Sequence, residues 1–184
     1  MKDLSKQNTH RMTLAALMAA VMCVLGPFSL PIGAVPISLT NFAVALAVWL
    51  LGPKWSAVSV AVYLALGAVG LPVFSGYAGG LAKLAGPTGG YLAGFVPMAL
   101  IAGLVLERTG YHPFRGWLGL VLGTAVCYGF GTLWFIAQMG CTLGHALAVC
   151  VYPFILFDLA KMGVSCVLGP VLRRRLADAG LLAD

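Results

Sequence analysis

Long apolar stretches alternate with short polar segments along this chain of 184 residues. Asp, Glu, Lys and Arg are absent from four stretches, residues 12–53, 55–82, 84–106 and 116–157. A helix that crosses a bilayer needs about 20 consecutive, mostly apolar residues. These stretches, together with the apolar residues before 173, hold five to seven such helices, and we therefore predict an integral membrane protein.

Glycine and proline divide the apolar stretches into six predicted helices. Gly52-Pro53 ends one helix, because proline lacks the N–H that a helix interior needs. Pro153 begins another, because that N–H is not needed in a first turn. We expect one membrane domain over residues 1–184, with transmembrane helices at 13–30, 41–51, 55–71, 91–106, 117–138 and 153–172.

Three connections between these helices contain more than a tight turn. Because of Gly33 and Pro36, we expect residues 31–40 to form an outer loop that is neither helical nor paired as a strand. Residues 75–90 are rich in glycine and predict a second outer loop. Residues 142–151 predict a short outer helix or loop.

The basic residues indicate how the helices are oriented. Six spans place both termini on one side of the membrane, whereas Lys83 falls on the other side and Lys161 within a helix. The remaining nine of the 11 Lys and Arg residues share the side of the termini: Lys2, Lys6, Arg11, Lys54, Arg108, Arg115, Arg173, Arg174 and Arg175. Because basic loops mark the cytoplasmic side, we predict an all-α protein of six transmembrane helices with both termini cytoplasmic.

The overall composition supports a membrane protein and excludes several functions. Hydrophobic residues make up 61% of the chain and charged residues 9%, against about 25% charged residues in soluble domains. The net charge of +6 does not indicate nucleic-acid binding, because the basic residues flank the apolar stretches. The five cysteines lack CxxC spacing, and neither GxxxxGK[ST] nor HExxH occurs. We expect no metal site, no cofactor and no ATP hydrolysis by this chain.

An intramembrane hydrolase is the enzymatic alternative. Ser75 and His145 are the candidate nucleophile and base. However, Val73-Phe74 precedes Ser75 where a GxSG motif would place a glycine. We therefore predict that the protein is not an enzyme.

Asp158 and Lys161 are the most informative pair in the sequence. They lie at positions i and i+3 of the last predicted helix, so they project from one face and can meet. Charged residues inside a span are costly and usually face a cavity or a partner. Two interpretations remain open, a salt bridge that only holds the helix in the bundle and a ligand site with one acceptor and one donor.

Three residues near the predicted outer ends are further binding candidates. Lys83 is the only basic residue in an outer loop, where it is either a counter-ion for a carboxylate or a solvated charge. Tyr91, after Gly89-Gly90, can stack on a ligand or anchor the helix at the interface. Asn41 can bind a ligand or cap the second helix.

Small residues at fixed spacing mark the cytoplasmic half of the first helix. Ala15, Ala16, Ala19 and Ala20 form two overlapping small-xxx-small pairs. Such pairs allow another helix to approach closely, either within the chain or from a partner. The spacing alone favours packing within the chain.

Four segments in sequence order resemble one known family. They are Pro31 to Lys54, which ends Leu-Leu-Gly-Pro-Lys, Gly67 to Phe95, which contains Gly-Pro-Thr-Gly-Gly-Tyr, Gly131-Thr132-Leu133-Trp134, and Pro153 to Lys161. Each segment is weak alone, but their order and spacing together are specific. The chain resembles BioY, the biotin-specific S component of energy-coupling-factor transporters.

The resemblance implies a function and a set of partners. Asp158 and Lys161 match the family's motif in the sixth helix and would bind biotin, the transported ligand, from outside. The loop at 33–40 resembles the family's gate over the site. The alanines of the first helix resemble its contact with a membrane-embedded T component, which works with two ATPase subunits. The family also has six helices with both ends cytoplasmic.

The sequence therefore predicts a biotin-binding subunit in the cell membrane of a bacterium or archaeon. The alternatives that remain are an S component for another vitamin, an intramembrane hydrolase and a structural packing subunit.

Overall fold

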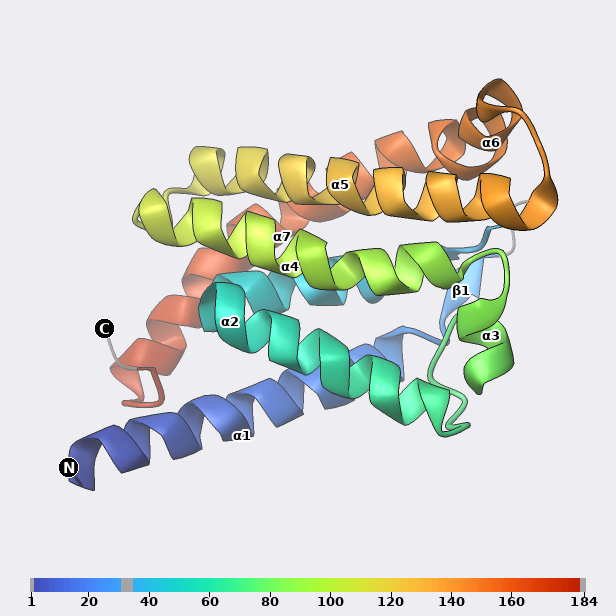
Figure 1. Cartoon of the computed structure of the whole chain (residues 1–184). Helices are drawn as coiled ribbons and strands as arrows, with labels where there is room; N and C mark the ends of the chain where they lie inside the picture. Colours follow the sequence, from blue (N-terminus) through green and yellow to red (C-terminus); the bar gives the residue numbers. More distant parts are fainter. Residues whose placement is uncertain (1, 31–34, 183–184) are drawn as a thin grey trace.

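A bundle of long helices makes up most of the protein. The computed structural model describes residues 2–30 and 35–182, with side chains described from residue 8 onward. Two short helices and one two-stranded hairpin lie at one end of the bundle (Figure 1). The elements are α1 (Lys2–Leu25), β1 (Ser29–Leu30), β2 (Ile37–Ser38), α2 (Thr40–Ala68), α3 (Leu81–Ala85), α4 (Gly89–Arg108), α5 (Pro113–Met139), α6 (Leu143–Cys150) and α7 (Tyr152–Asp178).

Helix α2 doubles back on itself at Gly52. Gly52 has φ +70° and ψ −170°, a conformation that favours glycine, and Pro53 cannot continue the hydrogen-bond ladder. The two arms on either side of Gly52 run in opposite directions (Figure 1). Tyr63 of the second arm packs edge-on against Phe74, with their ring centres 5.5 Å apart. Phe74 in turn lines the same cavity as Asn41 of the first arm.

The arrangement corrects the predicted number of separate spans. Five helices in the described part of the chain are long and apolar enough to cross a membrane. The predicted helices at 41–51 and 55–71 are the two arms of α2, and the predicted break between them lies at Gly52, where the backbone is not helical. The all-helical prediction is confirmed apart from the β1–β2 hairpin.

The first outer connection differs most from the prediction. Helix α1 begins at Lys2 and ends at Leu25, before Gly26-Pro27, and does not extend over 13–30. Ser29 pairs with Ser38 and Leu30 with Ile37 as antiparallel strands, so the expectation of an unpaired connection is wrong at these residues. Two short strands can satisfy each other's backbone groups where the helix has ended. Gly33 lies outside the described residues.

Other helix boundaries also differ from the prediction, because glycine, proline and charged residues mark helix ends only approximately. The 75–90 connection contains the short helix α3. The prediction of a short helix or loop at 142–151 is confirmed by α6 (Leu143–Cys150), whose first turn is capped by Thr142. Helix α7 continues past residue 172 through Arg173–Arg175 to Asp178, because charged residues do not end a helix once it has left the apolar layer.

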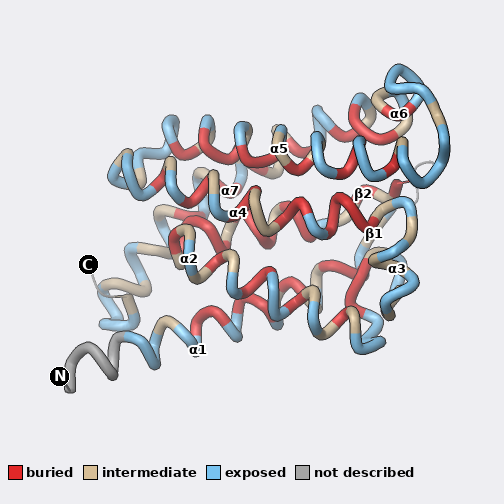
Figure 2. Tube along the Cα trace, viewed as in Figure 1, coloured by how far each residue is buried: buried red, intermediate tan, exposed pale blue. Residues whose placement is uncertain are grey.

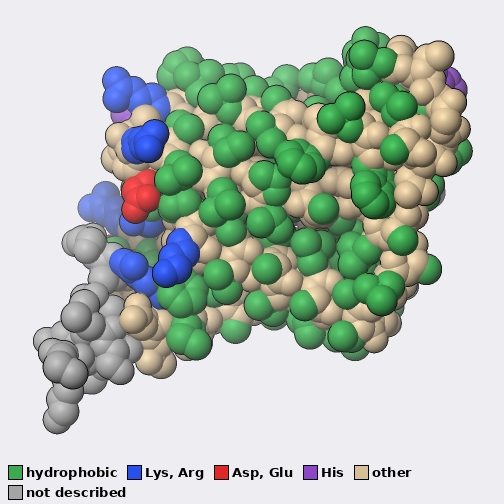
Figure 3. Space-filling model, viewed as in Figure 1, with side chains coloured by type: hydrophobic (Ala, Val, Ile, Leu, Met, Phe, Trp, Pro, Cys, Tyr) green, Lys and Arg blue, Asp and Glu red, His purple; other side chains and the backbone are tan. Residues whose placement is uncertain are grey.

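Burial separates a packed interior from an apolar exterior. Buried positions follow the faces that the helices turn toward one another (Figure 2). Large side chains such as Leu133, Leu156 and Val167 are exposed, and hydrophobic groups cover the visible flank of the bundle (Figure 3). Such an exterior suits contact with lipid.

Both termini lie at one end of the bundle, which we call the termini end, and the opposite end is the cavity end (Figure 1). Lys and Arg side chains gather at the termini end (Figure 3). This agrees with the prediction that both termini share one side of the membrane.

Trp49 anchors the termini end. Its indole is fully buried against Gly116 and Gly169. The Nη1 atom of Arg173 donates to the carbonyl oxygens of Trp49 (3.2 Å) and Leu50 (3.3 Å). The Arg173 guanidinium also lies 3.6 Å from the centre of the Tyr111 ring. We call Trp49, Tyr111, Gly116, Gly169 and Arg173 the Trp49 cluster.

Candidate functional site

A cavity opens among the helices at the cavity end. Its lining combines apolar side chains such as Phe74 and Phe95 with polar side chains such as Asn41 and Asp158. The lining residues are Val35, Pro36, Ser38, Asn41, Phe74, Ser75, Lys83, Thr88, Tyr91, Leu92, Phe95, Thr124, Cys127, Tyr128, Cys150, Phe154, Asp158 and Lys161.

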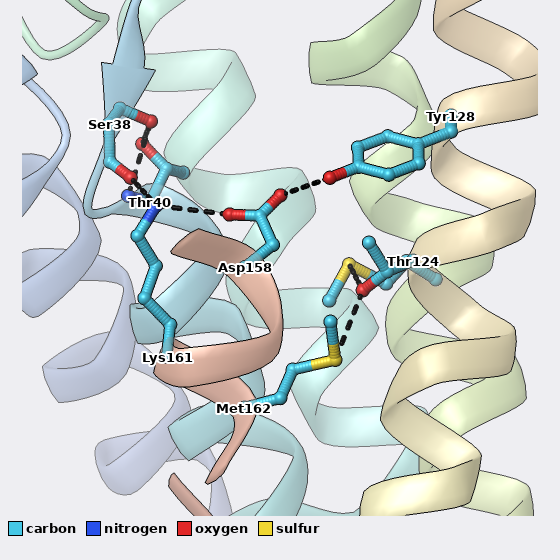
Figure 4. Close-up of polar contacts among 8 residues, drawn as sticks. Ser38, Thr40, Thr124, Tyr128, Asp158, Lys161 and Met162 are labelled. Carbon is cyan, nitrogen blue, oxygen red and sulfur yellow. Dashed lines mark hydrogen bonds and ion pairs between the residues drawn. The ribbon is translucent and has the colours of Figure 1, made fainter. Parts of the chain in front are cut away.

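The Asp158 carboxylate forms the polar centre of this cavity (Figure 4). Asp158 is 6% exposed. Its Oδ1 atom accepts from the Lys161 ammonium at 3.0 Å, and its Oδ2 atom accepts from the Tyr128 hydroxyl at 2.6 Å. Hydrogen bonds to ionised groups are short and strong. Each carboxylate oxygen retains capacity for another donor, so a ligand could add to this network without dismantling it.

Lys161 joins the same network to the first connection of the chain (Figure 4). Its ammonium donates to the backbone oxygen of Ser38 at 2.7 Å as well as to Asp158. The Ser38 hydroxyl donates to Thr40 Oγ1 at 3.1 Å, at the start of α2. The salt bridge predicted between Asp158 and Lys161 therefore forms, and it stands in the cavity wall rather than in a packed helix contact.

Two further predicted residues present different polar groups to the cavity. The Tyr91 hydroxyl is hydrogen-bonded to Thr132 Oγ1 at 3.1 Å, which fixes its ring above Gly131. Asn41 is 8% exposed, and its Oδ1 atom has no hydrogen-bond partner among the described residues. A buried acceptor without a partner is costly, so Asn41 retains capacity to bind a ligand's donor group.

The alternative role predicted for Asn41 is wrong. The residue that precedes α2 is Leu39, whose side chain makes no capping bond, and the Thr40 N–H donates to the Ser38 hydroxyl at 3.4 Å. Asn41 lies within the first turn of α2 and turns toward the cavity.

Lys83 lies on α3 and lines the cavity while remaining half-buried. No hydrogen bond or ion pair to another described residue engages its ammonium. All five predicted binding residues, Asn41, Lys83, Tyr91, Asp158 and Lys161, thus line one cavity. Their role in binding a ligand stays a prediction.

Tyr128 was missed from the sequence although a signal was present. Thr124, Tyr128 and Thr132 follow one another at intervals of four residues, so they share one face of α5. A polar row on an otherwise apolar transmembrane helix indicates a face turned away from lipid. Thr124 and Tyr128 line the cavity, and Thr132 holds Tyr91 beside it.

The four alanines of α1 divide between two faces. Ala15 and Ala19 are buried, and the backbone oxygen of Ala15 accepts a hydrogen bond from Ser59 at 2.7 Å. Ala16 and Ala20 are exposed. The first pair therefore packs within the chain, whereas the second pair faces outward.

The hydrolase alternative lacks its catalytic pair. Ser75 lines the cavity, but His145 does not. His145 is exposed in the first turn of α6, and its backbone N–H donates to Thr142 Oγ1 at 3.4 Å.

Comparisons with known proteins point to one family. The model of the BioY family matches residues 1–178. The biotin transporter BioY2 of Lactococcus lactis is 35% identical over 175 residues, which cover 93% of this chain and 95% of that protein. A probable biotin transporter BioY of Pyrococcus horikoshii is 36% identical over 90% of this chain and 98% of its own length.

A solved structure extends the likeness to the fold. The crystal structure of the S-component for biotin from an ECF-type ABC transporter is 31% identical to this chain. The two superpose with a TM-score of 0.85 over 92% of this chain and 93% of that one.

Proposed function

The chain belongs to the BioY family, and from that premise we propose that it is the biotin-binding S component of an energy-coupling-factor transporter. It is a multi-pass cell-membrane protein, and its family consists of transport proteins rather than enzymes. The observation that carries the proposal is the Asp158–Lys161 pair, held in the wall of a small-molecule cavity by Tyr128 and Ser38.

The chemistry of the cavity suits biotin. The ureido ring of biotin offers two N–H donors and one carbonyl acceptor, which match the Asp158 carboxylate and the Lys161 ammonium. Its bicyclic ring and thioether suit apolar surroundings such as Phe74 and Phe95. Lys83 is placed to attract the carboxylate of the valerate chain.

The segment around β2 supports a covering role for the first connection. Val35, Pro36 and Ser38 line the cavity, and Lys161 bonds to the Ser38 backbone. A ligand that engages Lys161 would therefore act directly on the segment that covers the cavity.

Equilibrium binding of biotin to the purified protein tests this function. We expect saturable binding of one biotin per chain, with no competition from thiamine or riboflavin at a hundredfold excess. Absence of biotin binding by folded protein would refute the proposal. Tight binding of one of the other vitamins instead would assign the protein to the alternative class of S components.

We further infer that the termini end faces the cytoplasm, where a T component with two ATPase subunits would dock. The basic residues at that end and the outward-facing pair Ala16 and Ala20 support this. Replacing both alanines with Trp should abolish coupled uptake and co-purification with the T component while leaving biotin binding unchanged. Val167→Trp, at an exposed position on α7, serves as the control. Unchanged co-purification of the double variant would contradict this contact.

A further inference from the structure

A second hollow adjoins the biotin cavity on the lipid-facing side of the bundle. It lies between α5 and α7. Its lining residues include Ala125 and Ile155, both of which are exposed. Thr124, Tyr128 and Asp158 line both hollows. We call the second hollow the α5–α7 crevice.

The wall between the cavity and the crevice contains a charged group. Asp158 belongs to both linings, so a charged residue stands between the biotin cavity and a hollow on the apolar side of the bundle. A carboxylate exposed to hydrocarbon is energetically costly. The wall must therefore hold Asp158 toward the polar side and keep lipid chains and their solutes away from it.

Tyr128 is placed to do both. Its hydroxyl donates to Asp158 Oδ2 at 2.6 Å, the contact in which α5 meets the carboxylate (Figure 4). Thr124 is unsuited to this role, because its hydroxyl is directed toward the sulfur atoms of Met98 and Met162 at 3.9 and 3.7 Å. Tyr128 lines each of the two hollows, so it is part of the wall that separates them.

We propose that Tyr128 is a positioning residue that aims Asp158 into the biotin cavity and seals the cavity from the α5–α7 crevice. With Oδ2 held by Tyr128 and Oδ1 held by Lys161, the carboxylate presents its remaining acceptor sites to the ligand in one orientation. Without the hydroxyl the carboxylate can turn, and without the ring the wall opens on the lipid side. The effect on biotin binding rests on the proposed function, whereas the seal does not.

The first test compares two Tyr→Phe variants. Tyr128→Phe removes the hydroxyl and keeps the ring, and Tyr152→Phe makes the same change at an exposed position of α7. We expect Tyr128→Phe to raise the Kd for biotin at least about tenfold, and Tyr152→Phe to leave the Kd unchanged. An unchanged Kd in folded Tyr128→Phe protein would overturn the positioning role.

The second test measures the seal without any ligand. Dicyclohexylcarbodiimide dissolves in the bilayer and modifies carboxyl groups that it can reach. Asp158 is the only acidic residue between Glu107 and Asp178, so mass spectrometry can assign its modification to one peptide. We expect Tyr128→Ala, which removes the ring as well as the hydroxyl, to increase the rate of this modification at least fivefold in proteoliposomes. Equal rates in folded Tyr128→Ala protein and the unaltered protein would overturn the seal.

A variant at another position keeps the labelling test decisive if the Tyr128 variants fail to fold. Ala125→Phe fills the crevice from the α5 side without touching the biotin cavity. It should slow modification of Asp158 by the bilayer-dissolved reagent while leaving biotin binding unchanged. An unaltered modification rate in this variant would show that the reagent does not reach the Asp158 carboxylate through the crevice. If the unaltered protein binds no biotin, the proposed function fails, and the labelling rates still decide whether Tyr128 forms the seal.

Discussion

The two ends of the bundle use the same kind of contact in different surroundings. At each end, a basic side chain of α7 donates to backbone oxygens in or next to the first arm of α2. Lys161 reaches Ser38 at the cavity end, and Arg173 reaches Trp49 and Leu50 at the termini end. The twelve residue steps from Lys161 to Arg173 span about 18 Å of helix, close to the length of the first arm. Helix α7 thus contacts the first arm of α2 near both ends of that arm.

The surroundings decide what each contact can do. The Arg173 guanidinium is stacked on Tyr111 and satisfies carbonyl oxygens that the break at Gly52 leaves without helical partners. The Lys161 ammonium instead shares its bonds with Asp158 beside an open cavity. A planar guanidinium suits a fixed, stacked contact, whereas an ammonium on a flexible stem can exchange partners. The termini end is built for packing, and the cavity end keeps polar groups available for a ligand.

Each end also contains one buried polar atom that lacks a partner among the described residues. Asn41 Oδ1 lies at the cavity, whereas Trp49 Nε1 lies among closely packed groups. Only an unsatisfied atom beside open space can acquire a partner from a ligand. The same local cost therefore points to function at one end and to tight packing at the other.

The largest expected effect is at the cavity end. Asp158→Asn removes the charge that both Lys161 and Tyr128 contact. We expect biotin affinity to fall at least about 100-fold, because bonds to a charged group contribute about 1.5–3 kcal/mol each. Isothermal titration gives the affinity, and monodisperse elution in detergent shows that the variant is folded. Loss of folding with no separate effect on the ligand would instead support a purely structural salt bridge.

The next effect belongs to the termini end and should spare the ligand. A methyl group added at Gly169 would overlap the indole ring of Trp49, whereas one added at Gly163 on the same helix meets nothing within 4 Å. We expect Gly169→Ala to destabilise the protein by about 1–3 kcal/mol, and Gly163→Ala to have little effect. Thermal unfolding in detergent measures both. Equal melting temperatures for the two variants would refute the close packing of the Trp49 cluster.

A smaller effect separates the two basic residues of α7. Arg173→Lys keeps the charge but loses the planar contact with Tyr111. We expect a loss of about 1 kcal/mol in stability, the usual size of a partly exposed cation–π contact, with biotin affinity unchanged. Thermal unfolding and titration together check this. A marked loss of affinity would mean that the two ends are not independent.

The smallest expected effect concerns Lys83 in the lining of the cavity. Lys83 is half-buried and engages no described partner. We expect Lys83→Gln to weaken biotin binding by about 1 kcal/mol, or roughly fivefold, as for a partly screened ion pair. Biotin methyl ester, which lacks the carboxylate, should bind the variant and the unaltered protein equally. An equal loss with the ester would assign Lys83 to another part of the ligand.

Much of the helical fold could be predicted, because a segment that crosses the hydrocarbon layer must be long, apolar and hydrogen-bonded within itself. Charge-free stretches of sufficient length define spans, and Gly52-Pro53 ends the first arm of α2 as expected. The β1–β2 pairing could not be predicted, because two-residue strands have no periodicity to detect. The extension of α1 to Lys2 and of α7 to Asp178 was missed because helices continue beyond the apolar layer that the pattern marks.

The site was predicted in its charged residues and not in the groups that orient them. Asp158 and Lys161 stand out because charge is rare inside a span. Tyr128 and Ser38 contribute a hydroxyl and a backbone oxygen, which are common in any sequence and acquire a role only when α5 and β2 meet α7. The split of the alanines between buried Ala15 and exposed Ala16 likewise depends on the direction from which α2 approaches α1.

The placement of both charges of the Asp158–Lys161 pair on α7 has a consequence for biosynthesis. The two groups meet at 3.0 Å within one helix, three residues apart. The segment that enters the bilayer during synthesis therefore brings its own counter-ion and is neutral at that depth before any other helix has packed against it. Had the two charges been on separate helices, each would have crossed the insertion machinery unpaired, at a cost of about 2.5–3.5 kcal/mol. The Asp158–Lys161 pair is thus compatible with insertion of the helices one after another.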